Sequence, residues 1–222
     1  MAPSPHPSLL WLNAHSDLRR RVTTQICRSQ SLSEILDIAV AELRDFLGCD
    51  RVKIYKFHPD GSGQVVAESL QADRLPSLLG LNFPADDIPG AARELFAQSR
   101  VRVVVDVAAG QIGHSSGQPA TPDATDFATI QYRAVDPCHA DYLTAMGVTS
   151  STVVPIFYQE QLWGLLVSHE AEARVLSEGD LEALQLVADL LSMAIAQATL
   201  HAEAQRQAQR EATLNHISHL LH

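Results

Sequence analysis

Basic charge is in short supply in this chain of 222 residues, which carries 16 lysine and arginine residues against 26 aspartate and glutamate residues. Its formal net charge is −10 at pH 7. Proteins that bind nucleic acids neutralise phosphates with a basic face, and this balance leaves few residues from which to build one. We therefore expect no nucleic-acid partner.

Cysteine is also scarce. Cys27, Cys49 and Cys138 form no C-x-x-C pair, and their odd number argues against a disulfide framework. The nucleotide and metal motifs G-x-G-x-x-G, G-x-x-x-x-G-K and H-E-x-x-H do not occur in the sequence. We expect a reduced protein with no zinc site.

Long apolar segments are missing as well. We find no uninterrupted run of about 18 apolar residues that could span a bilayer, and the N-terminus lacks the basic and apolar regions of a signal peptide. Because 46% of the residues are hydrophobic, the chain can still bury a large core. We expect a cytoplasmic protein that does not associate with a membrane.

Residues 1–29 are interpreted as an N-terminal part outside the main domain. The first dozen residues predict a flexible lead, and the polar segment from about Asn13 to Ser29 predicts a surface helix. A second, amphipathic helix is expected to begin at a capping box formed by Ser31 and Glu34 and to end at Gly48.

Short alternating apolar segments predict about five antiparallel strands. Two hairpins and one single strand are expected at residues 50–57, 64–69, 101–106, 150–157 and 162–168. A helix is expected from near Pro89, and a long loop rich in Gly, Ser and Pro over residues 108–126. Helices on one side of such a sheet give an α+β domain, which we place at residues 30–200.

A long helix is expected at the C-terminus. Ser177 and Asp180 predict its start, and its helical composition continues to the last residue. One small domain cannot bury a helix of about 40 residues, so residues 201–222 are expected to form a linker helix that pairs with another helix. This pairing is expected to give a homodimer, and the renewed apolar stripe from Leu214 onward suggests the start of a following output domain.

Cys138 lies in the first turn of a short helix expected between Asp136 and Gly147. The unpaired N–H groups and the positive end of the helix dipole favour the thiolate form of such a cysteine, whereas Asp136 opposes it. His139 and Tyr142 lie beside the thiol, so the segment could be an attachment point. The alternative is that Cys138 packs as a small buried residue and His139 is a satisfied polar side chain.

Four segments are similar to one family. Residues 50–57, 80–89, 133–147 and 162–169 resemble, in the same order, the motifs of the bilin-binding GAF domain of the phytochrome superfamily. The resemblance covers roughly residues 30–200. It implies a central antiparallel sheet, helices packed on one face and a long C-terminal signalling helix. Too few residues precede Ser31 for a PAS domain, which indicates the knotless phytochrome or cyanobacteriochrome branch.

The resemblance also implies a chromophore site. Cys138 would form a thioether to ring A of a linear tetrapyrrole, and His139 would pack against the pyrrole rings. Asp87 would hold the protonated pyrrole nitrogens. Arginines suit the two propionates because their fixed fork of donors matches a carboxylate. Arg102 and Arg133 would bind the propionates, and His169 would hydrogen-bond the ring D carbonyl. Tyr55, Phe83 and Tyr142 would surround ring D. Phe83 departs from the tyrosine that the family often has there.

The function implied is that of a photoreceptor module and not of an enzyme. The chromophore would be phycocyanobilin, the photochemistry red and far-red, and the output a domain such as a histidine kinase. Three other hypotheses remain open: a GAF domain for a small ligand such as a cyclic nucleotide, a cysteine enzyme that uses Cys138 with His169 as base, and a structural dimerisation domain.

Overall fold

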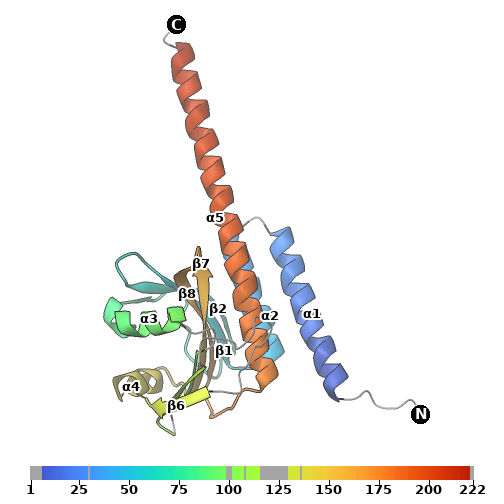
Figure 1. Cartoon of the computed structure of the whole chain (residues 1–222), viewed down its shortest axis with the longest axis vertical. Helices are drawn as coiled ribbons and strands as arrows, with labels where there is room; N and C mark the ends of the chain where they lie inside the picture. The colour runs from blue at the N-terminus through green and yellow to red at the C-terminus, as the bar shows by residue number, and fades with distance from the viewer. Residues whose placement is uncertain are drawn as a thin grey trace, which may run out of the picture.

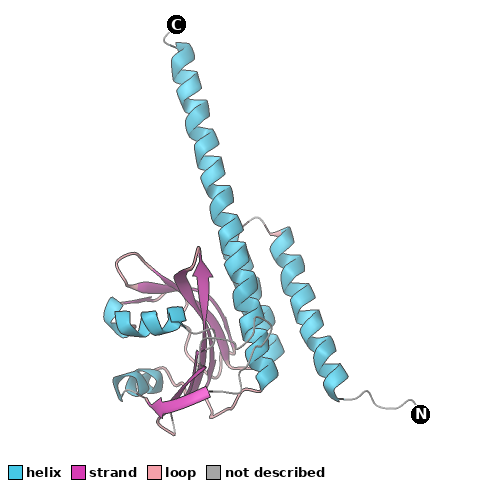
Figure 2. Cartoon of the chain, in the orientation of Figure 1, coloured by secondary structure: helices cyan, strands magenta, loops and turns pink. Residues whose placement is uncertain are grey.

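The computed structural model describes residues 7–29, 31–98, 102–107, 109–115, 130–135 and 137–220. In these residues an antiparallel sheet separates two groups of helices, and a single long helix leaves the domain at its C-terminal end (Figures 1 and 2). The α+β class, the central antiparallel sheet and the long C-terminal helix are confirmed.

The sheet contains eight strands in the described part of the chain, in the order β3-β2-β1-β8-β7-β4-β5-β6. Their bounds are β1 Arg51–Phe57, β2 Gly63–Leu70, β3 Asn82–Phe83, β4 Arg102–Asp106, β5 Gln111–Ser115, β6 Ile130–Ala134, β7 Ser150–Tyr158 and β8 Gln161–Glu170. The two expected hairpins, β1 with β2 and β7 with β8, are confirmed. Gln159 and Glu160 have φ angles of 49° and 62°, as the tight turn between β7 and β8 requires.

Helices lie on both sides of this sheet. The larger group comprises α1 (Pro7–Arg28), α2 (Leu32–Leu47) and α5 (Glu178–Leu220), which contact one another on one face. On the opposite side lie α3 (Gly90–Gln98) and α4 (Pro137–Ala145), as Figure 1 shows. The short η1 (Ala85–Asp87) comes just before α3 in the chain. The sequence predicted only the first of these two layers.

Each face of the sheet has its own hydrophobic core. The larger core joins α1, α2 and α5 to the sheet, and α2 supplies it with residues spaced three or four apart from Ile35 to Leu47. Val52 and Ile54 of β1 face this core, whereas Tyr55 belongs to the smaller core beneath α3 and α4. The sheet is therefore an internal layer, so a polar residue on its second face can be buried beneath α3 and α4.

Three local predictions were wrong. Helix α1 begins at Pro7, inside the segment expected to be a lead, because proline suits a first helical position. The capping box at α2 does not form: Ser31 occupies the cap position without a side-chain bond, and Glu34 instead accepts a hydrogen bond from Ser29 Oγ at 2.6 Å. Residues expected to lie in a long loop include strand β5, which pairs with β4 and β6.

Other end signals behave as predicted. Gly48 ends α2 with a φ of 61°, and its N–H bonds to the Arg44 carbonyl. At the start of α5, the Ser177 N–H bonds to Asp180 Oδ2 at 3.0 Å while the Asp180 N–H bonds to Ser177 Oγ at 3.2 Å. This reciprocal pair satisfies two backbone donors that the helix leaves unpaired.

Helix α5 contains a segment, Glu178–Leu214, that is long and apolar enough by length and composition to cross a membrane. Glu182 and Asp189 interrupt the segment, so it is not an uninterrupted apolar run. Its apolar residues serve the core: 44% of the most apolar window is buried, including Leu184, Leu191 and Ile195. A core helix of a globular domain passes the same compositional test.

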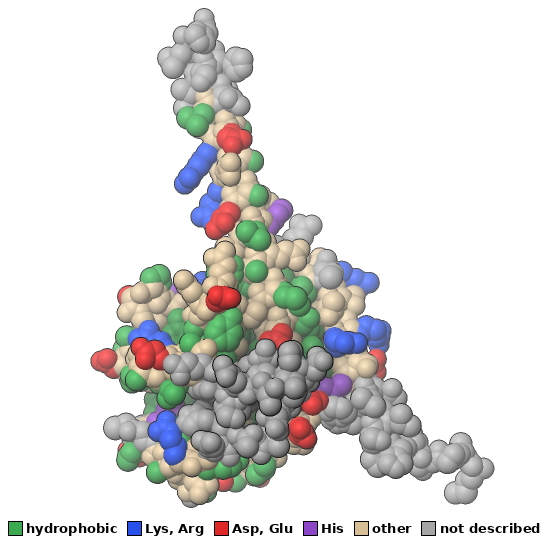
Figure 3. All heavy atoms as spheres, in the orientation of Figure 1, with side chains coloured by type: hydrophobic (Ala, Val, Ile, Leu, Met, Phe, Trp, Pro, Cys, Tyr) green, Lys and Arg blue, Asp and Glu red, His purple; other side chains and the backbone are tan. Residues whose placement is uncertain are grey.

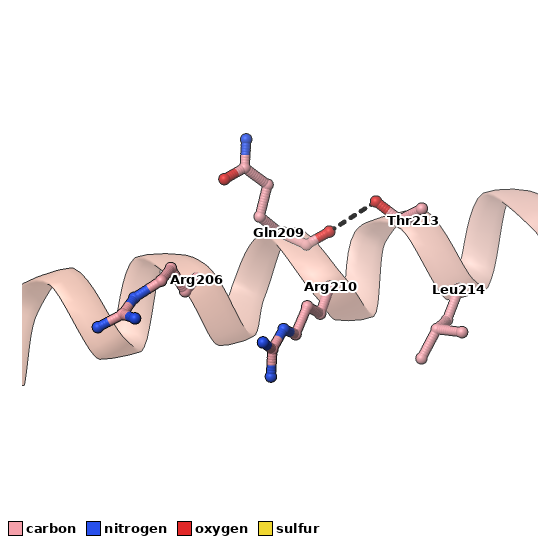
Figure 4. Close-up of a pocket in the computed structure, with 5 residues that line it drawn as sticks. All are labelled: Arg206, Gln209, Arg210, Thr213 and Leu214. Carbon is pink, nitrogen blue, oxygen red and sulfur yellow. Dashed lines mark hydrogen bonds between the residues drawn. The ribbon is translucent and has the colours of Figure 1, made fainter.

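The distal part of α5 stands clear of the sheet (Figures 1 and 3). All residues from 200 to 214 are exposed. Figure 4 shows the side chains of Arg206, Arg210 and Leu214 along this segment, where Thr213 Oγ1 donates a hydrogen bond to the Gln209 carbonyl at 2.9 Å. Leu214 is 63% exposed on a helix whose other side chains here are mostly polar.

Candidate functional site

Strand β1 places charged and aromatic residues on the face of the sheet that α3 and α4 cover. Arg51, Lys53 and Tyr55 alternate with Val52 and Ile54, which face the larger core. All five are buried. Because successive side chains of a strand point to opposite faces, the three residues share one surface. We call this surface, together with His169 of β8, the site face.

Arg51 and His169 are direct cross-strand partners in the pairing of β1 with β8. The Arg51 side chain is 0% exposed, and its Nη2 and Nε lie 2.7 Å and 3.2 Å from His169 Nδ1. Nη1 donates to the Pro76 carbonyl at 2.6 Å and lies 3.9 Å from Glu68 Oε1. A guanidinium carries only donors, so His169 Nδ1 must accept these bonds.

His169 is consequently a neutral imidazole with its proton on Nε2. Burial lowers the pKa of His169 well below its usual value, and the charges of Lys53, Arg51 and His139 lower it further. With Nδ1 occupied as an acceptor, Nε2–H is a hydrogen-bond donor held in a fixed direction. Such a donor suits a carbonyl oxygen.

Lys53 introduces a second cation next to Arg51. It is 6% exposed, its cross-strand partners are Glu68 of β2 and Val167 of β8, and its Nζ lies 5.8 Å from the centre of the Phe83 ring. Burial lowers the pKa of Lys53 to about 7, with a further lowering from Arg51 and an opposing effect from Glu68. The amine therefore titrates close to neutral pH in the folded chain.

Aromatic rings form a continuous row across the site face. From α4 to β1 the row runs His139, Tyr142, Phe83, Tyr55 and Phe57. Its successive ring centres lie 6.4, 6.2, 5.9 and 5.2 Å apart. Four of the expected site residues are thus brought together from three separate elements.

Tyr55 depends on a glycine for its position. A Cβ atom on Gly63 of β2 would lie 2.3 to 2.4 Å from the Tyr55 ring and hydroxyl, so only glycine lets the ring cross that strand. The Tyr55 hydroxyl is buried and has no hydrogen-bond partner among the described residues. A buried, unsatisfied donor is costly unless another molecule pairs with it.

Asp87 lies near both tyrosines of the row. Burial is the main cause that raises the pKa of Tyr55 and of Tyr142, and the Asp87 carboxylate raises both further. The two hydroxyls therefore keep their protons at neutral pH. Asp87 sits in η1, where its N–H bonds to the Pro84 carbonyl at 3.2 Å.

Helix α4 carries Cys138 as expected. The helix begins at Pro137 and ends in a turn where Gly147 has a φ of 72° and the Val148 N–H bonds to the Leu143 carbonyl at 2.9 Å. The Cys138 backbone is thus in the first turn, while its side chain and the whole of Asp136 lie outside the described residues.

The two candidate arginines lie near the far end of the sheet. Arg102 of β4 pairs with His114 of β5, and Arg133 of β6 pairs with Ile112 of β5. Paired residues share a face, and so do residues two apart on one strand, so this register assigns Arg102 and Arg133 to the face of Ile112. Ile112 packs in the core of the site face. The Arg102 side chain is outside the described part.

Comparison with known proteins adds a decisive observation. A family model described as "GAF domain" matches residues 31–195. A crystal structure of the phycocyanobilin-bound GAF domain from a cyanobacterial phytochrome is 56% identical and superposes with a TM-score of 0.76, covering 84% of this chain and 96% of that chain. This chain is a GAF domain of the phytochrome superfamily.

Curated relatives of this GAF domain are whole phytochromes. A bacteriophytochrome of Pseudomonas aeruginosa is 37% identical over 158 residues, which are 71% of this chain and 22% of that protein. Cyanobacterial phytochrome A of Nostoc sp. is 34% identical over 161 residues, 72% of this chain and 21% of that protein. The GAF domain thus spans about a fifth of the length of these relatives.

Sequence analysis of this GAF domain missed Arg51 and Lys53 of the site face and their neighbour Glu68 on β2. Arg51, Lys53 and Glu68 occupy the polar positions of alternating strands, and such positions suggest a solvated face when only one layer of helices is expected. The signal that could have identified them is the same alternation in Tyr55 and Phe57, whose rings need burial as much as the charges need partners.

Proposed function

We propose that this chain is a photoreceptor sensory module that binds phycocyanobilin covalently through Cys138. The observation that carries the proposal is the buried Tyr55 hydroxyl without a partner among the described residues, set within the aromatic row and beside Asp87. The 56% identity to GAF domains whose structures contain phycocyanobilin or phycoerythrobilin supports the choice of ligand class.

The residues of the site face fit the chemistry of a bilin. Its conjugated surface matches the aromatic row, and its terminal carbonyl matches the Nε2–H donor that Arg51 fixes on His169. Its two propionates need cations, which we assign to Arg102 and Arg133 by register and charge. Asp87 is assigned to the protonated pyrrole nitrogens.

The bound bilin supplies light absorption and photoisomerisation. The task of the protein is to hold and orient it. His139 and Tyr142 of α4 stack at 6.4 Å on the helix that carries Cys138, while Phe83 and Tyr55 approach from the sheet. The tyrosine hydroxyls and the His169 imidazole stay neutral hydrogen-bond donors at neutral pH, because burial opposes a charge on each.

We propose that the signal leaves through α5 toward an output domain such as a histidine kinase, with a homodimer formed by the distal helix. Strand β8 of the site face pairs with β7, and the Phe157 N–H of β7 bonds to Ser192 Oγ of α5 at 3.1 Å. A change in how the sheet packs would shift α5 between two packed positions. Red and far-red photochemistry and a cytoplasmic location belong to the same proposal, and no catalytic step is assigned to this chain.

The proposal is tested by producing the protein together with a phycocyanobilin pathway and recording absorption before and after red light. Zinc-induced fluorescence on a denaturing gel reports covalent pigment. We expect a reversible red band and a fluorescent protein. Cys138→Ala should lose the fluorescence, whereas Cys49→Ala, a matched control, should keep it because Cys49 is buried in the other core.

A colourless wild-type protein in this experiment would overturn the proposal. Titration with cyclic nucleotides by calorimetry would then test the other ligand class that the family can hold. Covalent pigment that persists in Cys138→Ala would leave the photoreceptor intact but place the thioether elsewhere.

A further inference from the structure

The buried amine of Lys53 has no task in the bilin site as assigned above. It sits at the centre of the site face, between the Arg51–His169 pair and the aromatic row, with Nζ 5.8 Å from the centre of the Phe83 ring. A lysine side chain reaches solvent easily when its strand position allows it, and burial of its charge is costly. A buried amine at a ligand site therefore calls for a functional explanation.

The residues around Lys53 do not fully compensate the charge of its amine. Among the described residues no carboxylate lies within 4.0 Å of Nζ to form an ion pair. Glu68, its cross-strand neighbour, is engaged elsewhere: it accepts hydrogen bonds from Ser77 Oγ and from the Leu78 N–H, and lies 3.9 Å from Arg51 Nη1. Glu68 thus shares its charge among several donors.

The other ionisable groups on the site face come from several elements. Arg51 of β1 is a second cation, and His169 of β8 is neutral. His139 of α4 lies close enough to act electrostatically on His169. Tyr55 of β1, Tyr142 of α4 and Asp87 of η1 also belong to the site face, and the two tyrosines keep their protons. Arg93 of α3 acts electrostatically on Tyr55 and lies 5.8 Å from the centre of the Phe57 ring, and the register places Arg102 and Arg133 on the same face.

We propose that Lys53 tunes the absorption of the bound bilin: by exchanging a proton with solvent, its amine switches the charge that the site presents beside Phe83 and His169. The inference rests on the proposed function. When the ammonium group gives its proton to water, a neutral amine remains and no other bond changes. Because a charge near one end of a conjugated ligand alters its absorption, the two states of Lys53 should give two spectra.

The direction of the switch follows from the charges. Burial and the neighbouring Arg51 guanidinium favour the neutral amine and bring the pKa of Lys53 to about 7, with Glu68 opposing. The site face thus gains one positive charge below neutral pH and loses it above. His169 stays neutral through this range, so it contributes no spectral change near pH 7.

The sequence makes this titration directly observable, because Lys53 and Lys56 are the only lysines in the chain. Protein labelled with ¹³C- and ¹⁵N-lysine gives two side-chain resonances, and Lys53→Met assigns them. In the pigment-free protein we expect the Lys53 resonance to titrate with a midpoint near 7. A midpoint near 10, as in an ordinary exposed lysine, would overturn the inference without any use of the bilin.

The second measurement is absorption of the pigmented protein between pH 6 and pH 9. We expect the wild-type band to shift along a one-proton curve and the bands of Lys53→Met and Lys53→Arg to stay constant, the first neutral and the second permanently charged. The same shift in both variants, or no shift in the wild type, overturns the role of Lys53. Failure of all three proteins to take up pigment overturns the proposed function instead, while the lysine resonance still reports on proton exchange.

Discussion

The Arg51 guanidinium donates to His169 Nδ1, with Nη2 at 2.7 Å and Nε at 3.2 Å, and both residues are buried. The contact fixes which nitrogen of the imidazole carries the proton, and so converts a histidine that could accept or donate into a donor of known direction. The two residues are 118 positions apart in the chain, and the β1–β8 register brings them together.

Replacing Arg51 should release this constraint. In Arg51→Met we expect His169 to populate both tautomers, visible as changed ¹⁵N shifts of its ring nitrogens. We also expect a loss of roughly 2–4 kcal/mol in the free energy of unfolding, because Glu68 then loses a buried cationic neighbour. Arg51→Lys serves as the control that keeps a charge but not the fork of donors. An unchanged tautomer in Arg51→Met would show that another group fixes the ring.

Gly63→Ala should displace the Tyr55 ring. The added Cβ atom would lie within 2.4 Å of ring atoms, so the ring or strand must move, at a cost of about 1–3 kcal/mol in the free energy of unfolding. Gly90→Ala at the start of α3 is the matched control, since its Cβ atom would meet nothing within 4 Å. Urea unfolding measures both, and equal effects in the two variants would contradict the close approach of Tyr55 to β2.

His169 should make the pigment-free protein acid-sensitive. Its pKa is lowered in the folded chain, so the unfolded chain takes up a proton below about pH 6.5 while the folded chain does not. Stability should therefore fall as the pH drops from 6.5 toward the folded-state pKa, by up to about 1.4 kcal/mol per pH unit. Urea unfolding of wild type and His169→Gln from pH 7 to pH 5 measures the difference, and parallel curves would exclude a neutral buried imidazole.

Lys53 should destabilise the pigment-free domain in a pH-dependent way. Its pKa is about 7 when folded and 10.5 in an ordinary environment, so the unfolded chain holds the extra proton between these values. Lys53→Met should therefore raise the free energy of unfolding by roughly 2–5 kcal/mol at pH 7 and below, and the gain should fade as the pH rises toward 10. Lys56→Met, on the same strand but only half-buried, is the control. A gain that does not depend on pH would point to packing alone.

Removal of the distal helix tests the proposed homodimer. In a chain ending after Leu200, the residues lost between 201 and 214 are all exposed, so we expect its thermal unfolding to change little. Light scattering should show a dimer for the whole chain and a monomer for the shortened one. A shortened chain that remains dimeric would place the interface on the domain itself.

Local sequence signals predicted where helices end better than they predicted which residues contact one another. Gly48 and Gly147 end their helices with positive φ angles, and Ser177 and Asp180 form the expected cap, because each signal acts within a few residues. Glu34 shows where this fails: Ser29 offers it a donor at 2.6 Å that the capping motif does not anticipate.

The candidate site shows the same division. Tyr55, Phe83, His139 and Tyr142 were expected from a resemblance to one family, and the structure brings them into one aromatic row, although their roles toward a ligand stay predictions. Arg51 and Lys53 could not be expected in this way. Arg51 and Lys53 are buried because a second layer of helices covers them and because β1 pairs with β8. Both arrangements depend on contacts between residues that are far apart in the sequence.

Strand β7 and helix α5 are joined at an irregular point of the sheet. The register of β7 with β8 shifts between Ile156 and Phe157, and the Phe157 N–H bonds to Ser192 Oγ, which itself donates to the Ala188 carbonyl at 2.9 Å. The Ser192 side chain thus links the end of the strand to one side of the helix, away from the helix axis. A twist of the strand end would turn α5 about its axis through this off-axis contact, so for the signalling proposed above we expect axial rotation of α5 and not sliding along its length.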